Sequence, residues 1–156
     1  MSPDEVFVTE LLRALADAKL EAIVVGSTAA VLQGAPVMTQ DIDLLIRDTP
    51  RNQEKLERLC AKLGGALVEV SPLSRTRRVM GLAISVDVLL DQISGGLSFA
   101  RVRSRAVTIP IGDQVATVAS LEDVITSKQA ANRAKDLAQL PILRDTLRIK
   151  AALDEP

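Results

Sequence analysis

The sequence contains no histidine, and this absence excludes several common catalytic and metal sites. Histidine-based general bases, Ser-His-Asp triads and the usual zinc sites all depend on that side chain. The single cysteine, Cys60, excludes an internal disulfide and suits a reducing cytoplasm, where we expect the protein to be located. Carboxylates, basic side chains and hydroxyls remain as the candidate reactive groups.

Aromatic residues are nearly absent as well, with two phenylalanines, no tryptophan and no tyrosine. The core must therefore consist of Leu, Val, Ile and Ala, and a base-stacking platform for single-stranded nucleic acid is not expected. The net charge of −1 gives no overall basic signal for nucleic acid either. The sequence contains no signal peptide and no apolar run long enough to cross a membrane, so we expect no membrane partner.

The length of 156 residues predicts a single domain over 1–156 with a core of its own. Residues 1–119 alternate between strand-like and helix-like patterns, whereas 120–156 is helical throughout. This predicts an α/β (α+β) fold, with a mixed central sheet flanked by helices and an all-helical C-terminal tail.

Apolar periodicity and turn residues predict the order of the elements. Ser2-Pro3, Thr49-Pro50 and the capping-box-like Ser120-x-x-Asp123 mark helix starts. Loops are expected at 72–78 and 91–98, and Pro141 is expected to break the tail. The expected helices are 3–19, 28–33, one from 49 to about 63, 120–131 and one from about 132; the expected strands are 22–25, 41–46, 66–70, one or two within 79–90, 101–111 and 114–119.

Gly26 and Ser27 lie between the strand at 22–25 and the following short helix. A helix N-terminus offers unpaired backbone N–H groups and the positive end of the helix dipole, which favour an anion such as phosphate. The alternative is a tight strand-to-helix turn without a ligand.

Three aspartates are the candidate metal ligands. Asp41 and Asp43 are two residues apart on one strand, so both side chains leave the same face, roughly 7 Å apart. Asp87 interrupts an apolar strand, where an ionised carboxylate is costly unless it meets solvent or a cation. If the two strands are neighbours, the three acids converge on one or two Mg²⁺ or Mn²⁺ ions, and Asp87 could also accept a proton from an incoming hydroxyl.

Two groups of arginines are the local basic clusters. Arg101, Arg103 and Arg105 would share one face of the strand at 101–111, and Arg75, Arg77 and Arg78 fall in the expected loop. They could hold an anionic acceptor such as RNA or stabilise charge on transferring phosphates. A solvated sheet face is the alternative for the first group.

The order strand, Gly-Ser, helix, Asp-x-Asp strand and a later strand with an aspartate resembles the nucleotidyltransferases of the DNA polymerase β superfamily. The small toxin-type group of abortive-infection and toxin–antitoxin systems is the most similar. Segment 34–45, Gly-Ala-Pro-Val-Met-Thr-Gln-Asp-Ile-Asp-Leu-Leu, is similar to that group's Gly-x-Pro-Arg-x-Thr-x-Asp-Ile-Asp-Leu-Leu. Segment 128–137 resembles its Lys-x-x-Ala-x-Arg-x-Lys-Asp-Leu. Val37 stands where the group usually has Arg, and Gln33 where His is frequent.

The resemblance implies a role for each candidate residue. Gly26 and Ser27 would bind the triphosphate of a nucleotide, and Lys128 would reach it from the helical tail. Arg133 and Asp136 would help to orient the triphosphate or the tail helix. For Asp136, the alternative is a pair with a basic neighbour. Ion pairs on the helix surface are the alternative for Lys128 and Arg133. The implied metal ligands are Asp41, Asp43 and Asp87.

The resemblance implies an Mg²⁺-dependent nucleotidyltransferase that transfers a nucleoside monophosphate from an NTP to a hydroxyl. The 3′ end of tRNA or a protein side chain is the favoured acceptor, with a cognate antitoxin or toxin as a further partner. The alternative is a non-catalytic module of the same fold that binds a nucleotide or a partner. Modification of an aminoglycoside-like drug is a third reading, but no additional acidic stretch for a polycationic substrate is evident.

Overall fold

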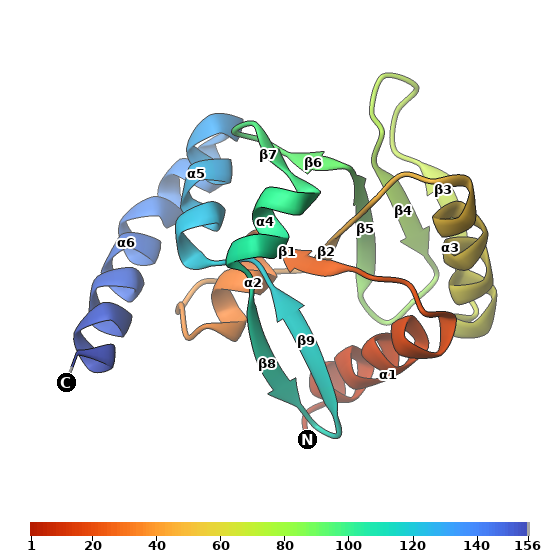
Figure 1. The fold of residues 1–156 in the computed structure, drawn as a ribbon, viewed down its shortest axis with the longest axis horizontal. Coiled ribbons are helices and arrows are strands. Elements are labelled where there is room, and N and C mark those ends of the chain that lie inside the picture. Colours follow the sequence, from red (N-terminus) through yellow and green to blue (C-terminus); the bar gives the residue numbers. More distant parts are fainter. Residues whose placement is uncertain (156) are drawn as a thin grey trace.

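The computed structural model describes residues 1–155, which form a mixed β-sheet with helices packed against it (Figure 1). The sheet has seven strands in the order β3-β4-β5-β2-β1-β9-β8. Its strands are β1 (Ile23–Val25), β2 (Asp41–Ile46), β3 (Ala66–Glu69), β4 (Arg77–Met80), β5 (Ser85–Leu90), β8 (Val107–Ile111) and β9 (Gln114–Val118). The predicted combination of a mixed sheet and a helical C-terminal segment is confirmed.

The central strands are the most buried part of the sheet. β1 pairs with β2 antiparallel and with β9 parallel, and β2 pairs with β5 in parallel. Every residue of β1 is buried, and so are the last three of β2. The sequence predicted this from the all-apolar runs, because a strand covered on both faces has no solvent side for polar residues.

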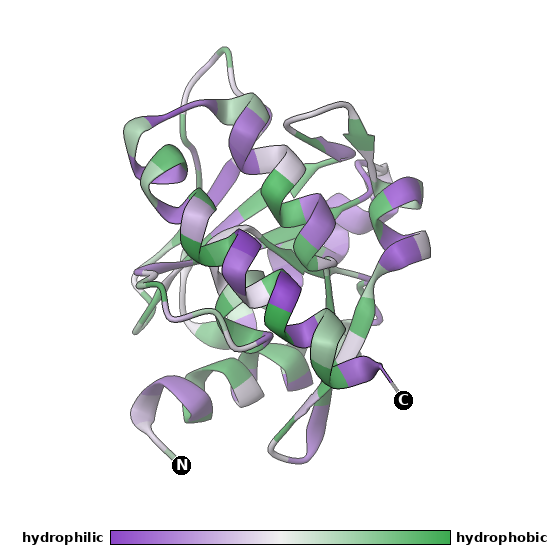
Figure 2. Ribbon diagram, turned by 90° about the vertical axis from the view of Figure 1, so that its left-hand side faces the viewer, coloured by the Kyte–Doolittle hydropathy of each residue, from purple (hydrophilic) through white to green (hydrophobic). Residues whose placement is uncertain are grey.

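Helices form two groups around the sheet. The first group is α1 (Pro3–Ala18) and α3 (Pro50–Leu63), which pack on each other. The second group is α2 (Gly26–Leu32), α5 (Leu121–Ala131) and α6 (Ala134–Asp154), with α5 in contact with both others. Figure 2 shows hydrophilic and hydrophobic residues alternating along α6, as expected for a helix that buries only one side. No helix of residues 1–155 combines the length and apolarity needed to cross a bilayer.

Three helix starts lie where the sequence predicts them. The hydroxyls of Ser2, Thr49 and Ser120 each accept a backbone N–H from three residues further on, which satisfies one of the free donors at a helix N-terminus. Pro3 and Pro50 each lie at the first helical turn, where the missing N–H has no cost.

The predicted strand at 101–111 is wrong in its first half. Phe99–Arg105 is a helix, α4, with Ser98 as its N-cap, and β8 begins only at Val107. Phe99 and Val102 are buried at helical spacing, and this packing overrides the alternating pattern of the arginines. The arginines at 101, 103 and 105 therefore do not share one face, since two steps along a helix turn through about 200°.

Three further features differ from the prediction. Pro141 lies inside α6, which continues because Leu140 and Leu143 are buried on either side of it. The expected loop at 72–78 ends early, because Arg77 and Arg78 belong to β4. The expected loop at 91–98 contains a small hairpin of β6 (Gln92–Ile93) and β7 (Leu97–Ser98).

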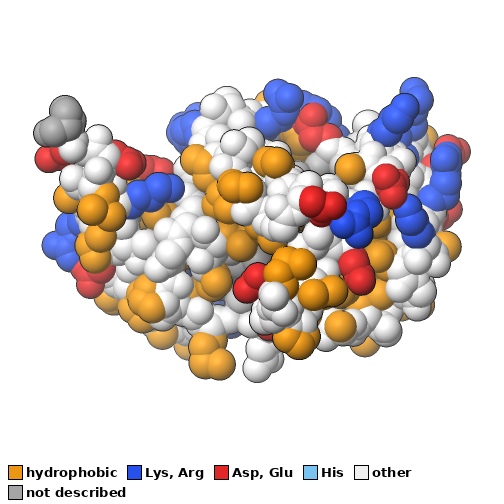
Figure 3. All heavy atoms as spheres, turned by 90° about the horizontal axis from the view of Figure 1, so that it is seen from below, with side chains coloured by type: hydrophobic (Ala, Val, Ile, Leu, Met, Phe, Trp, Pro, Cys, Tyr) orange, Lys and Arg blue, Asp and Glu red, His pale blue; other side chains and the backbone are white. Residues whose placement is uncertain are grey.

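Most of the clustered arginines are ion-paired, so the predicted basic clusters are largely neutralised. Figure 3 shows basic and acidic side chains lying next to one another on the face seen from below. The pairs are Arg75 with Asp48 and Asp91, Arg77 with Glu69, Arg78 with Asp87, Arg103 with Glu21, and Arg105 with Asp123.

Candidate active site

Gly26 allows the chain to turn from β1 directly into α2. Its φ is +67°, a left-handed backbone conformation that is unfavourable for residues with a Cβ. A Cβ at this position would lie 2.5 Å from Oδ2 of Asp43. The helix begins at Gly26 rather than at residue 28 as predicted, and the absence of a side chain lets the Asp43 carboxylate lie against the turn.

Asp43 and Asp87 lie opposite each other on two neighbouring strands. β2 and β5 are parallel, with Asp43 in register with Asp87 and Asp41 in register with Ser85. Burial, followed by the negative charges of Asp87 and Asp41, raises the pKa of Asp43 to about 6, and Lys128 and Lys135 reduce this effect. The three acids are therefore close enough to repel one another, and bound cationic charge would favour ionised Asp43.

Asp87, however, is occupied by a basic side chain. Arg78 donates from Nε to Oδ1 of Asp87 at 2.7 Å and from Nη2 to Oδ2 at 3.1 Å. Hydrogen bonds from Arg78 to Asp87 and the charge of Asp87, followed by the weaker fields of Asp41 and Asp43, raise the pKa of the arginine. Within residues 1–155, no three acidic or thiol side chains gather into a set that could hold a metal as they stand.

The carboxylates that fit a divalent cation in this conformation are those of Asp41 and Asp43. Both line the pocket described below and neither forms an ion pair within the described chain. Mg²⁺ binds through oxygen ligands and commonly uses one or two carboxylates together with substrate phosphates. The donor set therefore suits that ion, whereas Asp87 does not contribute while it is bound to Arg78.

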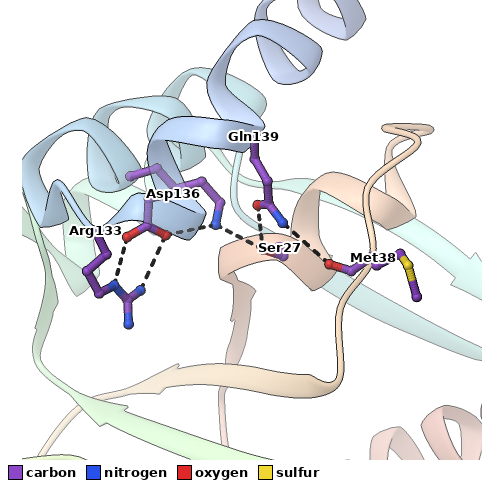
Figure 4. Close-up of polar contacts among 6 residues, drawn as sticks. Ser27, Met38, Arg133, Asp136 and Gln139 are labelled. Carbon is purple, nitrogen blue, oxygen red and sulfur yellow. Dashed lines mark hydrogen bonds and ion pairs between the residues drawn. The ribbon is translucent and has the colours of Figure 1, made fainter.

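Opposite these acids, a polar network joins α2 to the helical tail (Figure 4). Lys128 donates from Nζ to Oγ of Ser27 at 2.8 Å and also pairs with Asp136 at 3.3 Å. Asp136 is completely buried and accepts a second ion pair from Arg133 at 2.7 Å. Burial favours a higher pKa for Asp136, but Arg133 and Lys128 outweigh it and leave the pKa below the ordinary value.

Gln139 closes the network on its outer side. Ser27 donates its hydroxyl hydrogen to Oε1 of Gln139 at 2.9 Å, and Nε2 of Gln139 donates to the backbone carbonyl of Met38 at 3.4 Å (Figure 4). This one side chain on α6 thus contacts both the start of α2 and the loop that leads into β2.

These residues surround one pocket of about 410 Å³. Six of the seven predicted site residues line it, and the exception is Asp87. Its volume lies within the range usual for small-molecule sites, and its walls carry both carboxylates and cations. The lining residues predicted from the sequence are Gly26, Ser27, Asp41, Asp43, Lys128 and Arg133.

Several lining residues were missed by the sequence reasoning, among them Gln139, Thr39, Ser127 and Lys135. Lys135 lies within the Lys-x-x-Ala-x-Arg-x-Lys-Asp-Leu resemblance, which offered a signal for it. Gln139 had none, because it lies beyond the motif at 128–137 and its contacts with Ser27 and Met38 depend on how α6 packs in the folded protein.

The two departures from the motif have local structural explanations. Val37 is half-buried and packs against the core. Gln33 donates to the carbonyls of Ala29 and Ala119 and accepts from Lys150, so it ties α2 to the segment before α5 and to α6. Both residues thus have contacts that stabilise the fold.

Comparisons with known proteins agree with this architecture. Among solved structures, ANT(2")-Ia in complex with adenylyl-2"-tobramycin matches with a TM-score of 0.69 and 15% identity, over 94% of this chain and 90% of that one. The lincomycin-bound lincosamide antibiotic adenylyltransferase LnuA matches with a TM-score of 0.65 and 14% identity, over 94% and 98%. An antigenic nucleotidyltransferase-like protein from Paracoccidioides brasiliensis matches with a TM-score of 0.58 and 16% identity, over 96% and 78%. At these identities the likeness shows the fold.

No curated protein sequence matches the chain significantly. Residues 6–147 match the family described as "Nucleotidyltransferase of unknown function (DUF6036)". This range contains both strands that carry the aspartates, the Gly-Ser turn and the buried network around Asp136. The predicted membership in the nucleotidyltransferases is confirmed: the chain belongs to this nucleotidyltransferase family and shares its fold with the solved structures named above.

Proposed function

We propose that this protein transfers a nucleoside monophosphate from an NTP to a hydroxyl acceptor, with release of pyrophosphate, in a reaction that requires Mg²⁺ or Mn²⁺. The observation that carries the proposal is the pocket itself, which combines Asp41 and Asp43 with Lys128, Ser27 and neighbouring cations. A polyphosphate needs cationic partners along its length, and a divalent cation needs carboxylates. One pocket supplies both.

Each wall of the pocket has its own role in the proposal. The start of α2 at Gly26 and Ser27, with Lys128 and Arg133, binds the triphosphate, and Lys135 adds a further positive charge. Asp41 and Asp43 hold the divalent cation, which when bound neutralises charge on the transferring phosphate and its leaving group. Rate enhancement then comes from positioning and charge neutralisation, as is general for phosphoryl transfer.

The donor and the acceptor are proposed on different grounds. ANT(2")-Ia binds adenylyl-2"-tobramycin in its solved structure and LnuA is an adenylyltransferase, so ATP is the first donor to test. The motif resemblance to toxin-type nucleotidyltransferases favours the 3′ end of tRNA or a protein side chain as acceptor. Antibiotics such as tobramycin and lincomycin are the third class of acceptor. Besides Asp41 and Asp43, the acid within residues 1–155 that lines the pocket is Asp136, which is already paired with Lys128 and Arg133, so this part of the chain offers a cationic drug no further free carboxylate in the pocket.

The test is transfer of label from α-³²P-labelled NTPs in the presence of Mg²⁺ or Mn²⁺. Total tRNA, proteins of a cell lysate, tobramycin and lincomycin serve as separate acceptors. We expect label in one acceptor class, dependence on the metal, and loss of at least about a hundredfold in rate for Asp43→Ala, a typical loss for a group that stabilises the transition state. Asp113→Asn, an exposed acid paired with Arg13, is the matched control and should keep full activity.

The second candidate is a non-catalytic module that binds a nucleotide or a partner. The ion pair that occupies Asp87 and the valine at position 37 favour it. This module would bind ATP or a partner protein tightly yet transfer no label to any acceptor class.

A toxin role is tested separately, by expression in cells. A toxin should arrest growth, and Asp43→Ala should relieve the arrest. If wild type and Asp43→Ala both arrest growth, the toxicity does not come from the proposed transfer reaction. Growth that continues with the active wild type would exclude a toxin role in that host.

A further inference from the structure

Arg78, Asp87 and Asp43 form one row across three neighbouring strands. Arg78 of β4 is in register with Asp87 of β5, and Asp87 is in register with Asp43 of β2. A cation therefore lies directly beside the pair of acids, on the side away from Gly26. The row was not predicted from the sequence, because Arg78 was expected in a loop.

The two acids in this row are in different states. Asp87 accepts two hydrogen bonds from the planar guanidinium of Arg78, and its side chain is 15% exposed. Such forked pairs are strong and directional, and the energy of this one is retained only while Asp87 stays turned toward β4. Asp43 lines the pocket, whereas Asp87 does not.

We propose that Arg78 acts as a positioning residue that competes with the divalent cation for Asp87. While the ion pair is formed, the pocket offers a cation only Asp41 and Asp43. When the pair opens, Asp87 becomes a third ligand or the acceptor for the proton of the incoming hydroxyl. This inference rests on the proposed function, but its test measures metal binding and does not require the enzyme to turn over substrate.

The structure also provides a matched control for this pair. Arg77, the adjacent residue on β4, forms an ion pair with Glu69 of β3 at 2.8 Å, and its side chain is 28% exposed, compared with 37% for Arg78. Because adjacent strand residues point to opposite faces, Arg77 lies on the face away from the aspartate row. Replacing it removes the same charge from the same strand without touching Asp87.

The experiment measures Mn²⁺ binding to the nucleotide-free protein by calorimetry. If Arg78 competes with the cation, Arg78→Met binds Mn²⁺ about tenfold more tightly than wild type, a change that corresponds to about 1.4 kcal/mol. Arg77→Met should bind like wild type, and adding Asp87→Asn to Arg78→Met should abolish the gain. Equal or weaker binding by Arg78→Met, with wild-type circular dichroism, would overturn the proposal.

Thermal unfolding shows whether Arg78 competes with the cation for Asp87 or whether the Arg78–Asp87 pair only stabilises the fold. In EDTA, both roles predict that Arg78→Met melts below wild type, because the charge of Asp87 loses its partner. Only competition predicts that Mn²⁺ raises the melting temperature of Arg78→Met by more than that of wild type. Arg78→Lys, which keeps the charge but loses the fork, serves if Arg78→Met does not fold, and it should also bind Mn²⁺ more tightly; unchanged affinity would count against the proposal.

The two proposals fail in distinguishable ways. If no acceptor is labelled but the order of Mn²⁺ affinities holds, the catalytic proposal fails and the competition stands. If label is transferred but Arg78→Met gains no affinity for Mn²⁺, the competition fails and the catalytic proposal stands.

Discussion

At the residue scale, the site depends on the close approach of a backbone and a carboxylate. Asp43 lies against Gly26 because that position has no Cβ, and its pKa rises to about 6 because burial and two neighbouring acids oppose its charge. Two substitutions measure these effects separately, one at the turn and one at the carboxylate.

Gly26→Ala should destabilise the protein by roughly 2–4 kcal/mol, from left-handed strain and from the contact with Asp43 together. Gly96 is the control, since its φ is +69° but an added Cβ there would meet nothing within 4 Å. Gly96→Ala should cost only about 1 kcal/mol. Urea unfolding measures both, and equal losses would show that the contact with Asp43 has no energetic consequence.

Asp43→Asn should stabilise the metal-free protein at neutral pH. A carboxyl whose folded pKa lies above its unfolded value of 3.8 makes the native state bind more protons, so stability falls as pH rises from about 4 to 6. Above pH 6 the full cost is present, roughly 2 kcal/mol for this partly exposed group. Unfolding in EDTA at pH 4 and pH 7.5 tests this. The gain of Asp43→Asn over wild type should grow with pH, and a constant difference would contradict the assignment.

At the element scale, α5 and α6 act together through a buried acid. α5 ends at Asn132, whose φ of 56° turns the chain, and Arg133 and Asp136 follow at the start of α6. Asp136 then holds Lys128 of α5 and Arg133 at once, so two of the three cations that line the pocket depend on a side chain with no exposed surface.

Asp136→Asn should cost roughly 3 kcal/mol at pH 7, because it leaves the mostly buried Lys128 without its charge partner. The pKa of Asp136 is lowered, so its contribution is present above the unfolded value of 3.8 and is lost as pH falls through the folded value. The difference from wild type should therefore shrink below about pH 4. Asp145→Asn on the same helix, which breaks only an exposed pair with Arg148, should cost less than about 0.5 kcal/mol. Similar losses for both variants would contradict the role of Asp136.

The same scale shows where prediction from the sequence succeeded and where it failed. Helices with a capping hydroxyl and a proline start, such as those after Ser2 and Thr49, carry their signals within four residues, and these starts were predicted at the correct residue. α4 was missed because its alternating arginines imitate a strand, while its helical form depends on burial of Phe99 and Val102. α6 passes through Pro141 because packing on either side offsets the lost hydrogen bond, which local sequence does not reveal.

At the scale of the whole molecule, strand order decides which residues can meet. β1 and β2 occupy the middle of the sheet with β5 beside them, so segments around residues 26, 43 and 87 meet although they are far apart in the chain. From the sequence, the meeting of the three carboxylates was expected only if the two aspartate strands were neighbours, and the resemblance to nucleotidyltransferases implied it. The sequence did not predict that Arg78 would bind Asp87, because an ion pair between strands depends on register, which one sequence does not specify.

The most direct test of the central claim is a crystal structure with Mn²⁺ and a non-hydrolysable ATP analogue, with the metal located by its anomalous signal. The account predicts Mn²⁺ at the carboxylates of Asp41 and Asp43, and the triphosphate against Ser27 and Lys128. Mn²⁺ bound away from both aspartates, or a nucleotide bound outside the pocket, would contradict it.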